Sequence, residues 1–291
     1  MFEEFEQEYI ETDSADIALR RGGNGPPLVL LHGYPETGAM WNEVAPQLTD
    51  QFSVVIPDLR GYGRSNGPVS PSTADYSNRA MAEDVVTVMN ELGYDRFQMA
   101  GHDRGGRVAY RLALDRPNHV ERLVTLDMIP TLESVERMTC EAALVRFHWF
   151  FMAQPHPFPE TLIGTDPEYY IEYMLGRSGL DIFADEALNE YRECFDDDDV
   201  IRATCEDYRA GFSIDPEHDR ADREAGNQIE CPMLALWGET GSRKGRPTDI
   251  LGIWESWAKD VRGHPLDCGH YLPEEVPDDV ARDLRSFFQG R

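Results

Sequence analysis

The chain has 291 residues, and its 54 acidic and 27 basic side chains give a formal net charge of −27 at pH 7. This length suits one large domain with an insertion, and the negative charge argues against nucleic-acid or anionic-membrane partners. No apolar run is long enough to cross a bilayer, and the five cysteines are scattered without a C-x-x-C pair. With an acidic start that lacks the pattern of a secretory signal, the chain is expected to be cytoplasmic, without disulfides, metal or cofactor.

Short apolar runs alternate with helical patterns along most of the chain, which is typical of an α/β fold. Buried strands are predicted at 28–31, 53–56, 97–100, 123–126 and 233–237. Helices are predicted at 78–92, 104–114 and 278–288. The expected architecture is a mostly parallel sheet with helices on both faces.

The segment from about residue 130 to 224 interrupts this alternation. It is rich in aromatic and acidic residues and has helical patterns without strand signals. Excursions of the chain at the carboxyl ends of parallel strands lie over the ligand site of such sheets. We therefore expect a helical cap at 131–224, inserted into one core domain formed by 1–130 and 225–291.

A glycine-rich motif, GHDRGGR at 101–107, follows a predicted strand and opens a predicted helix. This matches the G-x-nucleophile-x-G elbow, in which small residues allow a sharp turn that exposes the nucleophile. The residue at the nucleophile position is Asp103. The alternative is a purely structural role, in which Asp103 only caps the following helix.

An aspartate at this position indicates a particular chemistry. A carboxylate is ionised at neutral pH and can attack a tetrahedral carbon without a base, whereas a serine would need activation. Asp103 would therefore displace a leaving group from an alkyl carbon and become an alkyl ester. Cleavage of that ester by water requires a base and an oxyanion hole.

Three motifs together carry a resemblance to a known family. HGYPE at 32–36, DLRGYGRS at 58–65 and the Asp103 elbow resemble the epoxide hydrolase and dehalogenase branch of the α/β hydrolases. The Asp-Arg-Gly-Gly-Arg form of the elbow resembles the fluoroacetate (haloacetate) dehalogenases, whereas other members of the branch usually have Trp in place of Arg104. The resemblance runs from about residue 28 to 288. It implies the α/β-hydrolase fold with an inserted helical cap, and homodimers occur in this family.

The resemblance also implies the partners of Asp103. His270, in a loop directly before the last predicted helix, takes the position of the base. The acid that orients it is expected to be Asp127, after the strand that follows the elbow helix, or else Glu239, after the next strand. The backbone N–H groups of Arg104 and Tyr34 are the expected oxyanion hole.

Two arginines follow the nucleophile within one helical turn. Arg104 and Arg107 are three residues apart, so both are expected on the same side of the helix, where they could bind one small carboxylate. The alternative is a pair of surface arginines that form ion pairs with this acidic chain. In the expected cap, His148, Trp149 and Tyr208 resemble the halide-stabilising group of the fluoroacetate dehalogenases. An aromatic run such as 147–151 can also simply be cap core.

The resulting expectation is a hydrolase that converts a small haloacid, fluoroacetate or chloroacetate, to glycolate and halide. An epoxide hydrolase would use the same Asp103 and His270, with two cap tyrosines to protonate the epoxide oxygen. The candidates for those tyrosines are Tyr169, Tyr173, Tyr191 and Tyr208. A non-catalytic ligand receptor of the same fold is the remaining alternative. The preferred halogen stays open at this point.

Overall fold

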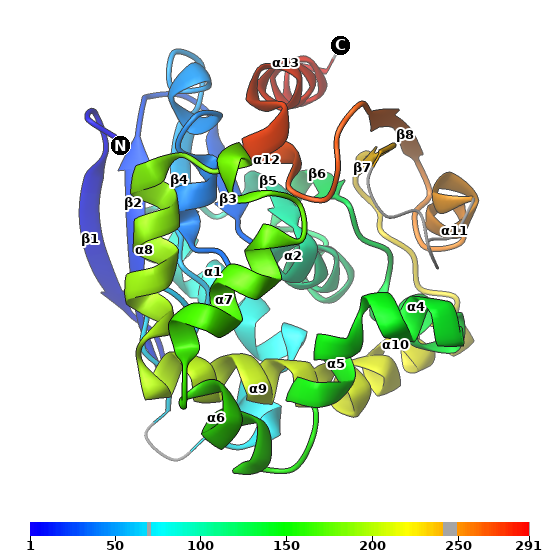
Figure 1. The fold of residues 1–291 in the computed structure, drawn as a ribbon. Helices are drawn as coiled ribbons and strands as arrows, with labels where there is room; N and C mark the ends of the chain where they lie inside the picture. Colours follow the sequence, from blue (N-terminus) through cyan, green and yellow to red (C-terminus); the bar gives the residue numbers. More distant parts are fainter. Residues whose placement is uncertain (69–70, 241–248, 291) are drawn as a thin grey trace.

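An eight-stranded sheet forms the centre of the molecule (Figure 1). The structure, a computed structural model, describes residues 1–68, 71–240 and 249–290. The strands are β1 (Glu6–Glu11), β2 (Asp16–Gly22), β3 (Pro27–Leu31), β4 (Ser53–Pro57), β5 (Phe97–His102), β6 (Val120–Leu126), β7 (Met233–Gly238) and β8 (Val261–Leu266). Their spatial order is β1-β2-β4-β3-β5-β6-β7-β8, antiparallel in the β1–β2 and β2–β4 pairs and parallel from β4 to β8. The predicted α/β fold with a mostly parallel sheet is confirmed.

The five predicted strands correspond to β3 to β7, whose side chains are largely buried. Inner parallel strands are covered on both faces and therefore have continuous apolar runs. The sequence did not predict β1, β2 and β8. Two of these, β1 and β8, are the edges of the sheet and expose many of their side chains, so their sequences lack such runs.

Helices and 3₁₀ turns of the core pack around this sheet. They are η1 (Gly38–Trp41), η2 (Ala45–Gln47), η3 (Thr73–Tyr76), α1 (Asn78–Glu91), α2 (Asp103–Asp115), α11 (Ile250–Glu255), α12 (Leu272–Glu275) and α13 (Pro277–Phe288). The Ser77 side chain caps α1 by accepting a hydrogen bond from the Ala80 N–H, and α13 begins with proline, which has no N–H to satisfy there. None of the helices in the described ranges has the length and apolar character needed to span a membrane.

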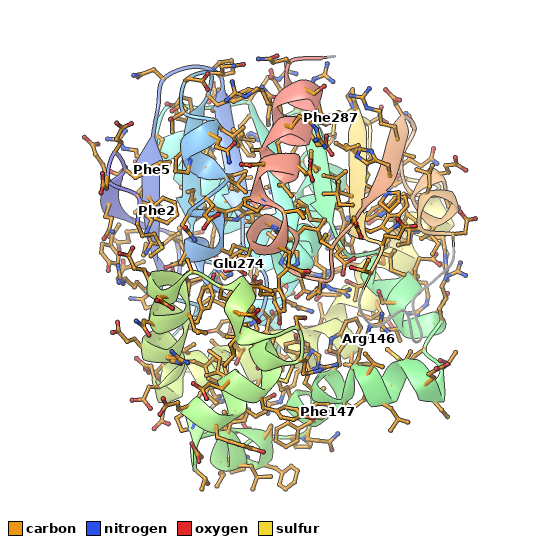
Figure 2. All side chains as sticks on the ribbon, turned by 45° about the horizontal axis from the view of Figure 1, so that its top comes forward. Phe2, Phe5, Arg146, Phe147, Glu274 and Phe287 are labelled. Atoms are coloured by element: carbon orange, nitrogen blue, oxygen red, sulfur yellow. The ribbon has the colours of Figure 1, made fainter. Side chains whose placement is uncertain are left out.

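A second group of helices is formed by the part of the chain that connects β6 to β7. It comprises α3 (Thr131–Glu136), α4 (Cys140–Val145), α5 (Phe147–Met152), α6 (Phe158–Ile163), α7 (Pro167–Gly176), η4 (Leu180–Ile182), α8 (Asp185–Phe195), α9 (Asp198–Phe212) and α10 (Ile214–Ala225). These helices gather on one side of the sheet (Figures 1 and 2). We refer to residues 131–225 as the cap.

Buried polar contacts join the cap to the core. Glu190 of α8 pairs with Arg20 of β2 (Nη2–Oε2 2.6 Å) and also accepts a hydrogen bond from Thr37 (2.6 Å). The Tyr191 hydroxyl donates to Glu274 of α12 at 2.7 Å, and Figure 2 shows Glu274 where the cap meets the core. Because breaking a buried pair leaves an uncompensated charge, these contacts fix the orientation of the cap over the sheet.

Candidate active site

Asp103 lies at the turn between β5 and α2. Its φ of 43° is in the left-handed region, which is unfavourable for a residue with a side chain. A Cβ on Gly101 would lie 2.4 Å from the Gly105 carbonyl oxygen, and one on Gly105 would lie 2.4 Å from that of His32. Glycine is therefore required on both sides of the turn. His102 occupies the N-cap position of α2 and Asp103 is the first helical residue, so the alternative capping role for Asp103 is not observed.

His270 lies between two aspartates. Its Nδ1 is 2.6 Å from Oδ2 of Asp127, and its Nε2 is 3.9 Å from Oδ2 of Asp103. Asp127 also accepts a hydrogen bond from the Gly238 N–H at 3.0 Å, which holds the carboxylate in place. A carboxylate at Nδ1 favours the tautomer whose Nε2 is a free acceptor. That nitrogen faces Asp103 beyond direct hydrogen-bond distance, as a base that acts on water rather than on the nucleophile requires.

The loop that carries His270 is fixed by Glu275 of α12. The Glu275 carboxylate accepts hydrogen bonds from the N–H groups of Gly269 (2.6 Å) and Tyr271 (2.9 Å), on either side of His270. The sequence did not single out Glu275, because an acid in the first turn of a helix is common. Glu239, the alternative orienting acid, is exposed after β7, whereas Asp127 is the acid in contact with His270.

The surroundings of Asp103 favour its ionised form. Burial by itself would raise the pKa of Asp103, but the charges of His270, His102 and the nearby arginines outweigh it and lower the pKa to about 2. The Tyr34 N–H points to Oδ1 of Asp103 at 3.5 Å. The Arg104 N–H belongs to the first turn of α2, where amides have no intrahelical acceptor. Both predicted backbone donors thus belong to segments that adjoin Asp103.

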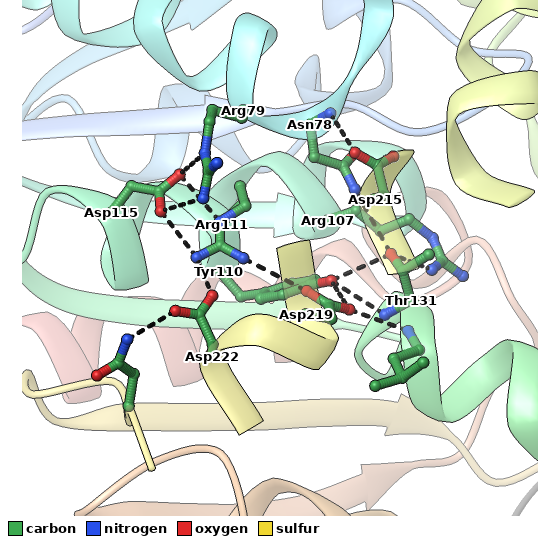
Figure 3. Close-up of polar contacts among 12 residues, drawn as sticks. Asn78, Arg79, Arg107, Tyr110, Arg111, Asp115, Thr131, Asp215, Asp219 and Asp222 are labelled. Carbon is green, nitrogen blue, oxygen red and sulfur yellow. Dashed lines mark hydrogen bonds and ion pairs between the residues drawn. The ribbon is translucent and has the colours of Figure 1, made fainter. Parts of the chain in front are cut away.

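Arg107 is buried at the cavity with no carboxylate partner in the described part of the chain. Its Nη1 donates to the Thr131 hydroxyl at 2.8 Å, and its guanidinium lies 4.9 Å from the centre of the Trp149 ring. The Tyr110 hydroxyl lies 3.1 Å from that of Thr131 and donates to Asp219 of α10 at 2.8 Å. Figure 3 shows this chain of contacts from α2 to the cap. Among the described residues, Arg107 is therefore held by hydrogen bonds to neutral hydroxyl groups and lines the cavity.

Arg104 does not join Arg107 at the cavity. Its Nε donates to Oδ2 of Asp207 at 2.7 Å, and Nη2 also bonds this carboxylate. Asp207, in α9, is fully buried and also accepts a hydrogen bond from Tyr62 at 2.6 Å. The prediction that both guanidinium groups converge on one anion is therefore corrected. Helical spacing placed the two arginines correctly on α2, but a buried carboxylate of the cap needs a cation and binds Arg104.

The cap supplies aromatic and imidazole groups opposite Asp103. The His148 ring stacks on Tyr34 (centroids 6.0 Å apart) and meets Tyr208 edge-on at 5.6 Å, and Trp149 follows in the same helix. Burial, followed by the charge of Arg177, lowers the pKa of His148 to about 3, so the imidazole is neutral at pH 7. These residues present N–H and O–H groups to the cavity together with an apolar surface.

Most of the predicted site residues line a cavity of about 470 Å³ between the core and the cap. Its lining includes the predicted Tyr34, Asp103, Arg107, Asp127, His148, Trp149, Tyr208 and His270. Arg104 is absent from that lining. The volume lies in the range of small-molecule sites. In the described ranges, no group of three or more His, Cys, Asp or Glu side chains is arranged to hold a metal ion.

A pair of buried carboxyl groups, Glu36 and Glu274, lies near Asp103 and His270. Glu36 is 3.1 Å from Nδ1 of His102, whose Nε2 is 2.8 Å from the His270 carbonyl oxygen, and Glu36 also bonds Glu274. Burial raises the pKa of Glu36 to about 8, and burial with the adjacent Glu36 raises that of Glu274 well above its usual range. The pair therefore retains protons at neutral pH. Glu36 belongs to the HGYPE motif, but nothing in the sequence pairs it with Glu274.

Glu36→Gln is expected to change how stability depends on pH. The folded state holds the Glu36 proton up to about pH 8, whereas the unfolded chain releases it near pH 4.5. The stabilising contribution of this protonation is therefore complete below pH 4.5 and is lost as pH rises to about 8. Glutamine cannot ionise, so the melting temperature of the variant should rise relative to wild type across this window. Exposed Glu43→Gln is the control, and parallel pH profiles for Glu36→Gln and wild type would contradict the assignment.

The sheet order, the cap between β6 and β7 and the strained elbow together define a hydrolase of the α/β-hydrolase fold. A family model described as alpha/beta hydrolase fold matches residues 26–277. ALR0039 from Nostoc sp PCC 7120 is similar in structure, with a TM-score of 0.95, 48% identity and coverage of 99% of both chains.

Sequence comparison identifies relatives of this chain within the α/β hydrolases. Fluoroacetate dehalogenase from Burkholderia sp is 43% identical over 99% of this chain and 95% of its own length. Soluble epoxide hydrolase from Corynebacterium sp. (strain C12) is 35% identical over 91% of both chains. The chain belongs to the haloacetate dehalogenase family of the α/β-hydrolase fold, as its elbow motif predicted.

Proposed function

We propose that this protein is a hydrolytic dehalogenase that converts haloacetates, such as fluoroacetate or chloroacetate, to glycolate and halide. The proposal rests on the position of Arg107, a buried guanidinium beside Asp103 whose hydrogen bonds within the described ranges go to the hydroxyl groups of Thr131 and Ser134. The ionised Asp103 is near enough to interact with this charge, but no carboxylate of the described residues forms an ion pair with Arg107, and a buried charge is stabilised by an anion at bonding distance. A substrate carboxylate fits this position, because guanidinium binds carboxylate in a planar, bidentate way.

In the first step, an ionised oxygen of Asp103 attacks the halogen-bearing carbon of the substrate. The new bond is a C–O ester bond to Asp103, and the C–X bond breaks with its electron pair on the halide. His148, Trp149 and Tyr208 can donate hydrogen bonds to the departing halide through neutral N–H and O–H groups. Fluoride leaves carbon poorly, so donors whose bonds strengthen as charge develops contribute most for that halogen.

In the second step, His270 removes a proton from water, which attacks the carbonyl carbon of the Asp103 ester. Asp127 holds the imidazole and stabilises the imidazolium that forms. Negative charge then develops on an Asp103 oxygen, toward which the Tyr34 N–H points. Collapse of this intermediate releases glycolate, whose hydroxyl group takes the proton from His270, and the second hydrogen of the water leaves the Asp103 carboxyl group as a proton, which restores its ionised form.

The epoxide hydrolase alternative finds less support in the cap. Of the four cap tyrosines considered, the described cavity lining includes Tyr208 alone. Tyr169 and Tyr173 are exposed, and the Tyr191 hydroxyl is bonded to Glu274. A neutral epoxide also has no group to compensate Arg107. Because a soluble epoxide hydrolase is among the relatives, the epoxide reaction should be tested together with the dehalogenase reaction.

The direct test measures halide from fluoroacetate and chloroacetate and diol from styrene oxide with one enzyme preparation. We expect halide release from the acids and little diol. Diol formation faster than halide release would favour the epoxide reaction. Inactivity on all three substrates, with a correctly folded enzyme, would overturn the proposal.

Thr131→Val is expected to weaken haloacetate binding through Arg107. The variant keeps the shape of the side chain but removes the acceptor that holds Nη1 of Arg107. A hydrogen bond to a charged group contributes roughly 1.5–3 kcal/mol, so KM should rise on the order of 10-fold, with a smaller change in kcat. Thr131→Ser, which keeps the hydroxyl, is the matched control and should restore KM. Equal KM values for the valine and serine variants would contradict this positioning role.

A further inference from the structure

The cavity carries more positive charge than one small carboxylate needs. Besides Arg107, its lining includes Arg137, Arg146 and Arg177. Arg137 is already compensated, because its Nε lies 2.9 Å from Oε2 of Glu133. Arg146 lies with its guanidinium carbon 5.6 Å from the centre of the Trp149 ring. Arg177 forms no ion pair with a carboxylate of the described residues, and its Nη2 bonds a backbone carbonyl instead.

Arg177 follows α7 and is exposed at the cavity. Its Nη2 donates to the Val145 carbonyl oxygen at 2.5 Å, and no carboxylate in the described ranges pairs with it. Acidic residues outnumber basic ones two to one in this chain, and most of its described arginines do pair with a carboxylate. Arg177 thus shares with Arg107 a charge that is anchored by neutral groups and directed to the cavity.

Arg107 belongs to α2 of the core, whereas Arg177 follows α7 of the cap. Arg107 lies over the ring of Trp149, whereas the charge of Arg177 acts on the neighbouring His148 and on Tyr271, next to the base. The His148 and Trp149 rings are nearly perpendicular, at 89°. Both arginines line the same cavity, Arg107 as a buried residue and Arg177 as an exposed one, so a carboxylate bound at Arg107 leaves Arg177 available to a second group of the same molecule.

The size of the cavity agrees with a longer substrate. At about 470 Å³ it has the volume of a site for a ligand larger than a two-carbon acid. The exposed Arg177 and Ser178 belong to its lining, so a substituent on the reacting carbon can extend toward this solvent-exposed part of the cavity. A substituent that ends in a negative charge would gain a charge-assisted hydrogen bond there.

We propose that the site also accepts 2-halo dicarboxylic acids, with the first carboxylate at Arg107 and the second at Arg177. This inference rests on the proposed dehalogenase function and extends its substrate class. The reaction is the same: Asp103 displaces halide from the carbon beside the first carboxylate, and water cleaves the ester. The products are one halide ion, one proton and a 2-hydroxy dicarboxylic acid.

The test compares 2-chlorosuccinate with 2-chlorobutanoate, whose side chain has similar length but no second charge. In wild type, kcat/KM should be higher for 2-chlorosuccinate. Arg177→Met should lower kcat/KM for 2-chlorosuccinate about 10-fold or more, as expected for a lost charge-assisted bond, and should change that for 2-chlorobutanoate and chloroacetate by less than about threefold. Arg137→Met is the matched control: this arginine lines the same cavity but is compensated by Glu133, so all three substrates should be unaffected.

Binding of unreactive acids provides a readout that does not depend on turnover. Calorimetry should show that succinate binds wild type more tightly than butanoate, and that Arg177→Met removes this difference while Arg177→Lys retains part of it. Equal losses for 2-chlorosuccinate and 2-chlorobutanoate, or equal binding of succinate and butanoate to wild type, would overturn the second carboxylate position. Absence of halide from chloroacetate in wild type would instead overturn the proposed function itself.

Discussion

His270→Asn is expected to stop the reaction after the first half and to trap the ester on Asp103. Asparagine occupies similar space but cannot take a proton from water, while attack by the ionised Asp103 needs no base. General-base catalysis typically contributes about 10²- to 10⁴-fold, and steady-state halide release should fall by this order. A burst of halide equivalent to the enzyme concentration should precede the slow phase.

Mass spectrometry of the peptide that contains Asp103 checks this result. With chloroacetate, the peptide from His270→Asn should carry a carboxymethyl group, whereas the wild-type peptide at steady state should carry less of it. His264→Asn is the control, because this exposed histidine pairs with Asp283 and does not belong to the cavity lining. Full activity in His270→Asn, or an unmodified Asp103 peptide after the halide burst, would remove His270 from the role of base.

Asp127→Asn is expected to cause the second largest loss. The amide can no longer hold the Nδ1 proton of His270 or stabilise the imidazolium, and its N–H group favours the wrong tautomer. In Ser-His-Asp enzymes the equivalent change lowers kcat about 10⁴-fold, so a loss on the order of 10²-fold or more is expected here. The halide burst should survive, because the first step does not use the base.

Glu239→Gln is the matched control for Asp127→Asn. Glu239 was the alternative acid on the next strand, but it is exposed and Asp127 is the carboxylate at Nδ1 of His270. Halide release should remain within about threefold of wild type in Glu239→Gln. A larger loss in Glu239→Gln than in Asp127→Asn would reverse the assignment of the orienting acid.

The buried strands and the elbow could be predicted because their physical requirements are local. Strands β3 to β7 have apolar runs, since both faces of an inner parallel strand are covered. The elbow needs Gly101 and Gly105 because a Cβ on either would collide with backbone. The ends of α1, α2 and α13 were each predicted to within one residue, because helix starts and stops have local signals.

Contacts between the cap and the core could not be predicted, because their partners are distant in the chain. The pairing of Arg104 with Asp207 joins residues 103 positions apart, and the bond between Tyr110 and Asp219 joins residues 109 positions apart. Helical spacing alone made Arg104 and Arg107 equivalent. A single buried carboxylate from α9 distinguishes them, and only the folded cap supplies it. The homodimer implied by the family stays a prediction.

The edge strands β1 and β8 could not be predicted from the sequence either. Their exposed side chains follow no apolar pattern, so partner strands rather than their own sequences determine the pairing. The raised pKa values of Glu36 and Glu274 likewise depend on the contact between α12 and the HGYPE segment, which are distant in the chain.

Single turnover in ¹⁸O-labelled water, with enzyme in excess over chloroacetate, tests the nucleophilic role of Asp103 most directly. If water attacks the carbonyl carbon of the ester, one ¹⁸O atom should enter the Asp103 carboxylate and the glycolate from that first turnover should be unlabelled. Labelled glycolate with an unlabelled Asp103 peptide would show that water attacks the substrate itself, and would contradict the assignment of Asp103 as the nucleophile.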